Sequence, residues 1–130
     1  MEALGFSMIK FPDMRKELLE HLAELADRKY QENCWVKKQC PVGIEYDELD
    51  YSVHFLFDDT QLSENPESMV GYCLNNEQEV KAISLVCRSL DQLFGKYGYD
   101  KSDEEYISCP EWQYVIDAAR EALSVFNGYE

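Results

Sequence analysis

The amino-acid sequence predicts an all-α fold, a compact single-domain helical bundle of about five or six helices, two of them short. Apolar residues recur every three or four positions along three long stretches, which is the spacing of one helical face. Residues that begin or end helices stand at the borders of these stretches, and no convincing run of strands occurs. The 130 residues, of which 45% are hydrophobic, correspond to one globular domain, residues 1–130.

The first predicted helix follows a short N-terminal extension, residues 1–10. Pro12 suits the first turn of a helix, and an apolar stripe continues from there to about Trp35. His21 falls at a position that leans toward solvent, so we expect it on the surface. The next segment, residues 37–43, contains proline and glycine and is expected to form a turn or short loop.

Residues 45–57 have apolar residues at helical spacing, but the alternation of Val53, Phe55 and Phe57 also fits a strand. We favour a helix, because the run is about 12 residues long and its acidic first turn complements the positive end of a helix dipole. Residues 65–74 open with Asn-Pro, which predicts a short helix.

The longest helix is expected to follow a cap at Asn75 or Asn76. Its first turn is acidic, and its apolar stripe is that of a core helix. Gly98 stands at its C-terminal boundary, where glycine commonly adopts a left-handed conformation.

Two helices are expected in the remaining chain. Ser102 and Glu105 match the capping box, which predicts a short helix over residues 103–108. Pro110 precedes the last helix, which carries a regular apolar stripe and is stopped by Asn127-Gly128.

The charge of the chain is strongly negative and unevenly distributed. The net charge is −14, and residues 45–79 carry acidic side chains while no lysine or arginine occurs between Lys38 and Lys81. Nucleic acid and anionic membranes are therefore excluded as direct partners, because both would be repelled. The composition predicts a basic protein partner.

Tyrosines lie among these acidic residues, and interfaces favour tyrosine as a packed anchor while charges steer association. The predicted partner-binding residues are Tyr46, Asp47, Glu48, Asp50, Tyr51, Asp58, Asp59, Glu64 and Glu67. A second acidic cluster, residues 103–111, could extend this face.

Motifs for catalysis are missing from the sequence. The glycine patterns of nucleotide sites, the serine-hydrolase elbow and the calcium-loop signature do not occur. His54 precedes Asp58 by one helical turn, which predicts a structural helix pair. The alternative is a small metal-dependent enzyme that uses His54 with Asp50 and Asp58. We favour a protein that is not an enzyme, with no catalytic, cofactor or metal site.

The five cysteines are an odd number with no Cys-x-x-Cys pair, so a disulfide framework would leave one thiol over. The N-terminus does not match a secretory signal, and no apolar run approaches the roughly 20 residues of a membrane span. We therefore expect a cytoplasmic protein with reduced cysteines.

Three series of residues carry a resemblance to a known family. They are Phe11-Pro12-Asp13-Met14-Arg15, then Asp47-Glu48-Leu49 followed by Val53-His54-Phe55-Leu56-Phe57-Asp58-Asp59-Thr60, and Pro110-Glu111-Trp112 with Val115-Ile116-Asp117-Ala118-Ala119-Arg120. The chain beyond Lys10 is similar to a small bacterial family of uncharacterised all-α proteins. Members of this type resemble immunity proteins of bacterial toxin systems, including contact-dependent growth inhibition.

The resemblance implies a small cytosolic protein that binds and neutralises a cognate toxin domain. Combined with the charge, it leads to the hypothesis of an acidic face that covers a basic toxin domain, and the favoured target is a nuclease whose positive groove normally holds phosphates. The alternative is a regulatory adaptor that binds a basic host protein. The oligomeric state is left open.

Overall fold

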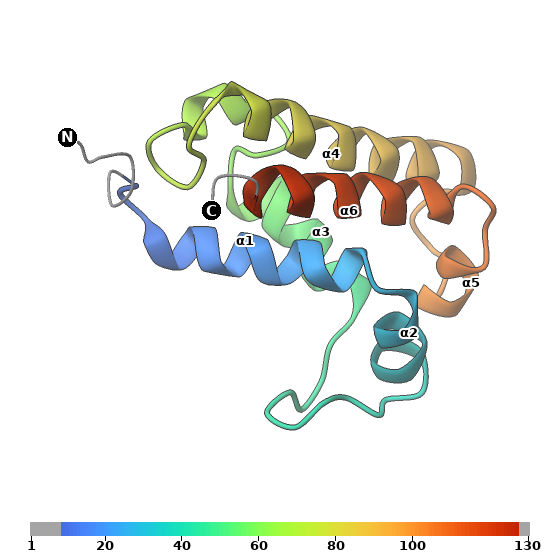
Figure 1. Cartoon of the computed structure of the whole chain (residues 1–130). Helices are drawn as coiled ribbons and strands as arrows, with labels where there is room; N and C mark the ends of the chain where they lie inside the picture. The colour runs from blue at the N-terminus through green and yellow to red at the C-terminus, as the bar shows by residue number, and fades with distance from the viewer. Residues whose placement is uncertain (1–8, 128–130) are drawn as a thin grey trace.

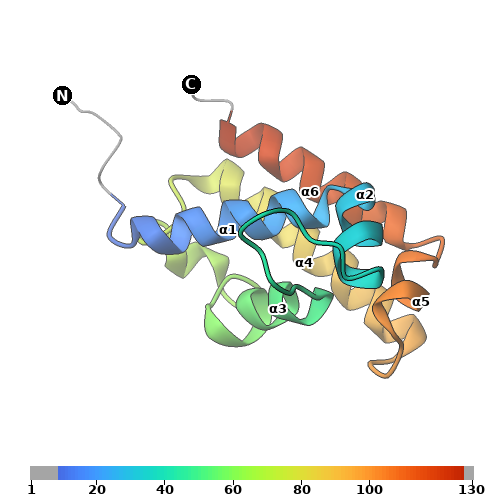
Figure 2. The same cartoon turned by 90° about the horizontal axis from the view of Figure 1, so that it is seen from below.

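Three long helices form the centre of the molecule: α1 (Pro12–Leu25), α4 (Glu77–Tyr97) and α6 (Trp112–Asn127). The computed structural model describes residues 9–127. Helix α6 packs against both α1 and α4 (Figure 1). Figure 2 shows α3 (Leu49–His54) on the side of α1 and α4 that lies opposite α6. No β-strand occurs within the described residues, and the predicted all-α fold is confirmed.

Shorter segments complete the bundle. They are α2 (Arg28–Tyr30), the π-helix η1 (Gln31–Val36), the π-helix η2 (Phe55–Asp59), the 3-10 helix η3 (Pro66–Met69) and α5 (Asp103–Ile107). In the part of the chain that the structure describes, no helix has the length and apolar character required to cross a membrane. Of the expected N-terminal extension, residues 1–8 lie outside the described range.

The predicted apolar stripes of the long helices form the core. The stripe of α6 is buried along its whole length and comprises Trp112, Val115, Ile116, Ala119, Ala122 and Phe126. The two alanines leave room for close approach of neighbouring helices, and the larger residues fill the space between them. Helix α4 contributes Ile83, Val86, Leu90 and Leu93, all with 0% exposure.

The predicted caps of α4 and α5 are present, whereas the Asn65 side chain makes no capping bond to η3. The Asn76 side chain accepts a hydrogen bond from the Glu79 N–H at 3.0 Å, which places the start of α4 at the second of the two expected asparagines. Ser102 and Glu105 form both bonds of the capping box that begins α5. Gly98 follows α4 with φ of +82°, a value that favours glycine.

The prediction of one continuous helix from Pro12 to about Trp35 is wrong, because α1 ends at Leu25. The Asp27 side chain accepts a hydrogen bond from the Tyr30 N–H at 3.1 Å and thereby begins α2, as an N-cap residue does. The fully buried Gln31 then donates to the carbonyls of Glu24 and Leu25 at 2.8 and 3.0 Å, which satisfies the end of α1.

The helix expected over residues 45–57 is shorter at its start and longer at its end. It begins at Leu49, whose N–H donates to the Asp103 carboxylate of α5 at 3.0 Å. At its end, α3 continues into η2, and the Thr60 hydroxyl donates to the Phe55 carbonyl at 2.8 Å. The alternative strand does not form. Residues 65–74 are helical only over η3, because Gly71 reverses the chain with φ of +91°.

The expected surface position of His21 is wrong. Its side chain is buried between α1 and α3, where it packs on the Phe55 ring with a centroid distance of 4.8 Å. Its Nδ1 atom lies 2.8 Å from the Ser52 hydroxyl. Helix periodicity could not reveal this position, because a second helix covers a face that is polar in sequence.

The expectation of five reduced cysteines is also wrong, since a disulfide joins Cys34 and Cys40. The π-helix η1 and the turn that follows it bring their Cα atoms within 4.3 Å. Cys73 and Cys87 are buried free thiols inside the core. The disulfide closes the base of the segment that leads to α3.

A candidate protein-binding groove

A shallow groove lies between α3 with η2 and the C-terminal part of α4. It consists of two adjoining hollows of about 260 and 310 Å³, both lined by Asp50, Val53, Phe94 and Tyr99. We call it the acidic groove and define it by its carboxylates, which are Glu48, Asp50, Asp58, Asp91 and Asp103. These carboxylates come from α3, η2, α4, α5 and the residue before α3, so the fold gathers them from four helical elements.

The floor of the groove is aromatic. Phe94 is buried and stacks on Tyr99 with a centroid distance of 5.2 Å, and it meets Tyr106 edge-on at 5.3 Å. The turn at Gly98 folds Tyr99 back over α4, and the Tyr106 hydroxyl donates to the Gly98 carbonyl and fixes that turn. Tyr99 keeps 78% of its surface exposed. An aromatic surface is therefore available to a partner within a rim of carboxylates.

Positive charge is scarce along the groove. Lys101 is the one lysine or arginine among the residues that line the two hollows. His54 lies between Asp50 and Asp58, with ion-pair distances of 3.4 and 2.7 Å, so the predicted helix pair is present. All three side chains are more than half exposed. Within residues 9–127, no group of three or more histidine, cysteine or acidic side chains is arranged to hold a metal ion.

Asp103 has both a structural position and a place in the groove. Burial raises the pKa of this carboxyl above its usual range, and the hydrogen bond from the Leu49 N–H opposes that rise. The bond joins the start of α3 to the start of α5. Asp103 therefore connects α3, which forms one wall of the groove, to α5.

The structure divides the predicted partner-binding residues into three groups. Glu48, Asp50 and Asp58 line the groove, and the rings of Tyr46 and Tyr51 meet beside them with a centroid distance of 6.0 Å.

The exposed residues Asp59, Glu64 and Glu67 do not line the groove. Glu67 belongs to η3, which lies at the N-terminal end of α4 (Figure 1). The helical rise places that end roughly 25 Å from Phe94.

The prediction that Asp47 contributes to the binding face is wrong. The residue is only 5% exposed, so its carboxylate cannot act as a surface charge. Its carboxylate accepts hydrogen bonds from the Tyr30 hydroxyl at 2.7 Å and from the Trp35 indole N–H at 3.0 Å. Burial and the bond to Asp47 raise the pKa of Tyr30. Asp47 thus connects the segment before α3 to α2 and η1.

Among the acidic residues of the predicted second cluster, only Asp103 lines the groove. Glu105 belongs to the capping box, and Glu111 accepts hydrogen bonds from Lys96 at 2.6 Å and from the Tyr97 hydroxyl at 2.7 Å. These bonds lower the pKa of Glu111 to about 2. Sequence reasoning missed Asp91 and Tyr99, because the first is one surface acid on a core helix and the second follows its end.

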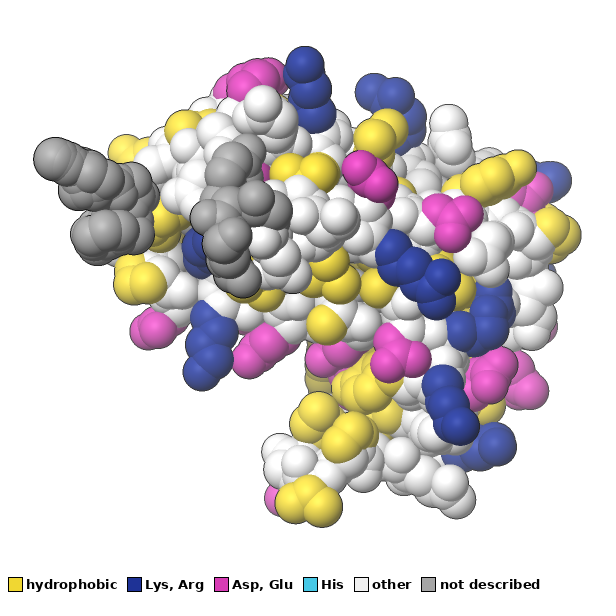
Figure 3. Space-filling model, viewed as in Figure 1, with side chains coloured by type: hydrophobic (Ala, Val, Ile, Leu, Met, Phe, Trp, Pro, Cys, Tyr) yellow, Lys and Arg dark blue, Asp and Glu magenta, His cyan; other side chains and the backbone are white. Residues whose placement is uncertain are grey.

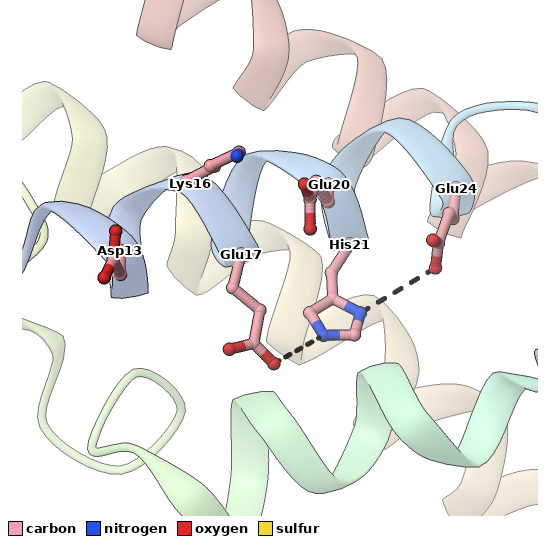
Figure 4. Close-up of a pocket in the computed structure, with 6 residues that line it drawn as sticks. All are labelled: Asp13, Lys16, Glu17, Glu20, His21 and Glu24. Carbon is pink, nitrogen blue, oxygen red and sulfur yellow. Dashed lines mark hydrogen bonds and ion pairs between the residues drawn. The ribbon is translucent and has the colours of Figure 1, made fainter. Parts of the chain in front are cut away.

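A further hollow, of about 410 Å³ and separate from the acidic groove, runs along α1. Figure 4 shows Glu17 and Glu24 pointing toward His21 from neighbouring turns, with distances of 3.4 and 3.8 Å to the ring nitrogens. Burial raises the pKa of Glu24 to about 8, and the neighbouring Asp47 carboxylate adds to the rise. The folded state therefore favours the protonated form of Glu24, which adjoins Asp47 at the base of the segment before α3.

The raised pKa of Glu24 makes stability depend on pH. Between pH 4.5 and about 8 the folded protein keeps a proton that the unfolded chain releases, so the free energy of unfolding should fall as pH rises through this range. Glu24→Gln should remove this component, on the order of 1 kcal/mol after allowance for solvent screening. Urea denaturation at several pH values measures it. Glu121→Gln, an exposed change on α6, serves as the control and should keep the wild-type slope. Equal slopes for the Glu24→Gln and wild-type proteins would contradict the prediction.

The comparison with protein families finds one match. A family model described as a domain of unknown function, DUF7945, matches residues 9–128. The match covers nearly the whole chain, so the protein belongs to this family. No curated protein and no solved structure matches it.

Proposed function

We propose that this member of the DUF7945 family is an immunity protein, which binds and neutralises a cognate toxin domain of basic charge through the acidic groove. The observation that supports the proposal is the arrangement of the groove itself. Carboxylates from four helical elements surround an aromatic floor in which Tyr99 is exposed, with one lysine at the rim. The groove thus combines charged groups with an aromatic surface on which a partner can pack, as protein interfaces do.

The charges give the groove a means of attracting its partner. A net charge of −14 on 130 residues produces a strong negative potential, and an apolar floor concentrates the field within the groove. Such fields raise association rates with basic partners and weaken as salt is added. A toxin that binds nucleic acid must carry a positive surface, which makes a nuclease domain the target class that we propose.

The size of the groove suits protein side chains. Pockets that enclose a small molecule usually measure about 300–1,000 Å³ and bury most of the ligand. The two hollows, of about 260 and 310 Å³, are close to the lower limit and lie on the surface. One or two arginine or lysine side chains of a partner would fill them, with their aliphatic parts on Phe94 and Tyr99.

The proposal includes no catalytic step. His54 is paired with the Asp50 and Asp58 carboxylates on its own helical face, and all three side chains are more than half exposed. A regulatory adaptor would use the same surface. The two functions differ in the partner, which is toxic to the cell only for an immunity protein.

The identity of the partner tests the proposal directly. Tagged protein is mixed with host lysate at low and high salt, and the bound protein is identified by mass spectrometry. We expect one basic protein at low salt, and its expression alone should stop growth while co-expression with this chain restores it. A partner that is not toxic would favour the adaptor, and an acidic partner would overturn the proposal.

Neutralising the groove should weaken this complex. The triple variant Asp50→Asn, Asp58→Asn and Asp91→Asn removes three exposed charges, and we expect the Kd at low salt to rise at least about tenfold. Calorimetric titration measures it. The matched control, Glu64→Gln, Glu67→Gln and Glu121→Gln, removes the same charge outside the groove and should change the Kd less than about threefold. Equal effects of the two variants would show that net charge alone is recognised.

A further inference from the structure

A loop projects from the body of the protein and carries apolar side chains into solvent. The loop comprises residues 41–46, and all six residues are exposed. Val42 is fully exposed, Tyr46 is 48% exposed and Ile44 is 37% exposed. Figure 1 shows this segment extending below α1, and Figure 3 shows hydrophobic side chains gathered on the same projection. A cluster of large apolar residues on a projection is unusual for a surface that has no binding role.

Both ends of the loop are fixed to the core. The disulfide between Cys34 and Cys40 holds the first end, and Cys34 is only 1% exposed. The buried Asp47 carboxylate, bonded to Tyr30 and Trp35, holds the second end. The loop therefore cannot move away from the helices as a free segment.

The tip of the loop has its own turn. The Ile44 N–H donates to the Pro41 carbonyl at 3.0 Å, and Gly43 between them has φ of +93°. A segment that is ordered before binding loses less conformational entropy when a partner closes over it. The loop thus presents Val42 and Ile44 in a fixed position, although neither belongs to the hydrophobic core.

The charges beside the loop indicate what covers it. Glu45 lies within it, and Glu48 and Asp50, which line the acidic groove, follow it directly. The adjacent Lys38 lies with its Nζ 4.3 Å from the centre of the Tyr46 ring. A second copy of this chain, with its net charge of −14, or an anionic lipid surface would be repelled.

We propose that residues 41–46 form an apolar anchor that inserts into a hydrophobic pocket of the same basic protein that occupies the acidic groove. This inference rests on the proposed function and extends its interface by a second, uncharged contact. The pocket would be rimmed by lysine or arginine side chains that face Glu45 and Glu48. The groove then supplies attraction, and the loop supplies contact area that salt does not screen.

Site-specific photo-crosslinking in the host tests the location. The photoreactive residue benzoylphenylalanine replaces Val42 in one variant, Tyr99 of the groove in a second and the exposed Tyr114 of α6 in a third. We expect positions 42 and 99 to capture the same basic protein and position 114 to capture none of it. Capture at position 99 alone would overturn the loop assignment and leave the proposed function standing. Capture of this chain itself or of an acidic protein at position 42 would also overturn it. If neither position captures a basic protein, both proposals fail.

Affinity for the protein captured at position 99 then separates the two contacts. We expect Val42→Ser with Ile44→Ser to raise the Kd by at least about tenfold at both about 50 mM and about 500 mM NaCl, because burial of aliphatic groups is not screened. The groove variant Asp50→Asn, Asp58→Asn and Asp91→Asn should raise the Kd mainly at the lower salt concentration. Circular dichroism confirms that each variant is folded. An unchanged Kd for the loop variant would overturn the inference.

Discussion

An Arg15→Met variant should lose about 3–5 kcal/mol of unfolding free energy, because the substitution leaves a buried carboxylate without its counter-charge. Arg15 pairs with Glu79 through two hydrogen bonds of 2.9 Å, and Glu79 is fully buried. Arg15 also donates to the Cys73 carbonyl at 2.9 Å and lies 4.8 Å from the centre of the Phe126 ring. The Arg15 side chain therefore connects the start of α1 to the start of α4 and to the end of α6.

Guanidinium chloride denaturation measures this loss. Arg88→Met on the exposed face of α4 is the matched control and should change stability by less than about 0.5 kcal/mol. The double variant Arg15→Met and Glu79→Gln should recover much of the loss, because a neutral amide can still accept the hydrogen bond from the Asn75 N–H. A loss below about 1 kcal/mol for Arg15→Met would show that water replaces the arginine.

A Gln31→Leu variant should be destabilised by about 3 kcal/mol, because it leaves the buried Leu25 carbonyl and the buried Trp112 indole N–H without their partners. The Gln31 amide donates to the carbonyls of Glu24 and Leu25, and its oxygen accepts from the Trp112 indole N–H at 2.8 Å. Leucine has a similar volume, so the loss comes from hydrogen bonding and not from a cavity.

The same denaturation experiment, with a control variant, separates the loss of the Gln31 hydrogen bonds from the effect that a glutamine-to-leucine change has by itself. Gln92→Leu on the surface of α4 changes the same side chain where it is exposed, and should stay within about 0.5 kcal/mol of the wild type. If the Gln31→Leu protein is as stable as the Gln92→Leu protein, water molecules must form the hydrogen bonds that the Leu25 carbonyl and the Trp112 indole N–H have lost.

The sequence predicted α4 and α6 closely, because each has a long apolar stripe with recognisable boundaries. Asn76 begins α4 as expected, and Gly98 follows its end. The segment between α1 and α3 could not be predicted in the same way. Its conformation depends on contacts with residues outside the local pattern, such as the bond from Leu49 to Asp103 of α5. Local periodicity contains no information on such contacts.

The sequence allowed prediction of the carboxylates of the acidic groove but not of its aromatic floor. Glu48, Asp50 and Asp58 belong to the acidic stretch, and the structure places them together. Phe94 reads as an ordinary core residue of α4, and only the folded chain shows that Tyr99 extends that aromatic surface into the groove. Asp47 was misassigned for the opposite reason, since nothing in the local pattern reveals that a tyrosine and a tryptophan bind it.

The edge-on contact between Trp35 and Trp112 gives the protein a built-in optical reporter. The chain has two tryptophans, both are buried, and their ring centroids lie 6.1 Å apart. The Trp35 indole donates to Asp47 at the base of the projecting loop, and the Trp112 indole donates to Gln31 at the end of α1. Fluorescence emission therefore responds to two distinct parts of the fold without an added label. In a Trp112→Phe protein, the remaining signal would follow the loop base alone, so loosening of the loop could be observed separately from unfolding of the bundle.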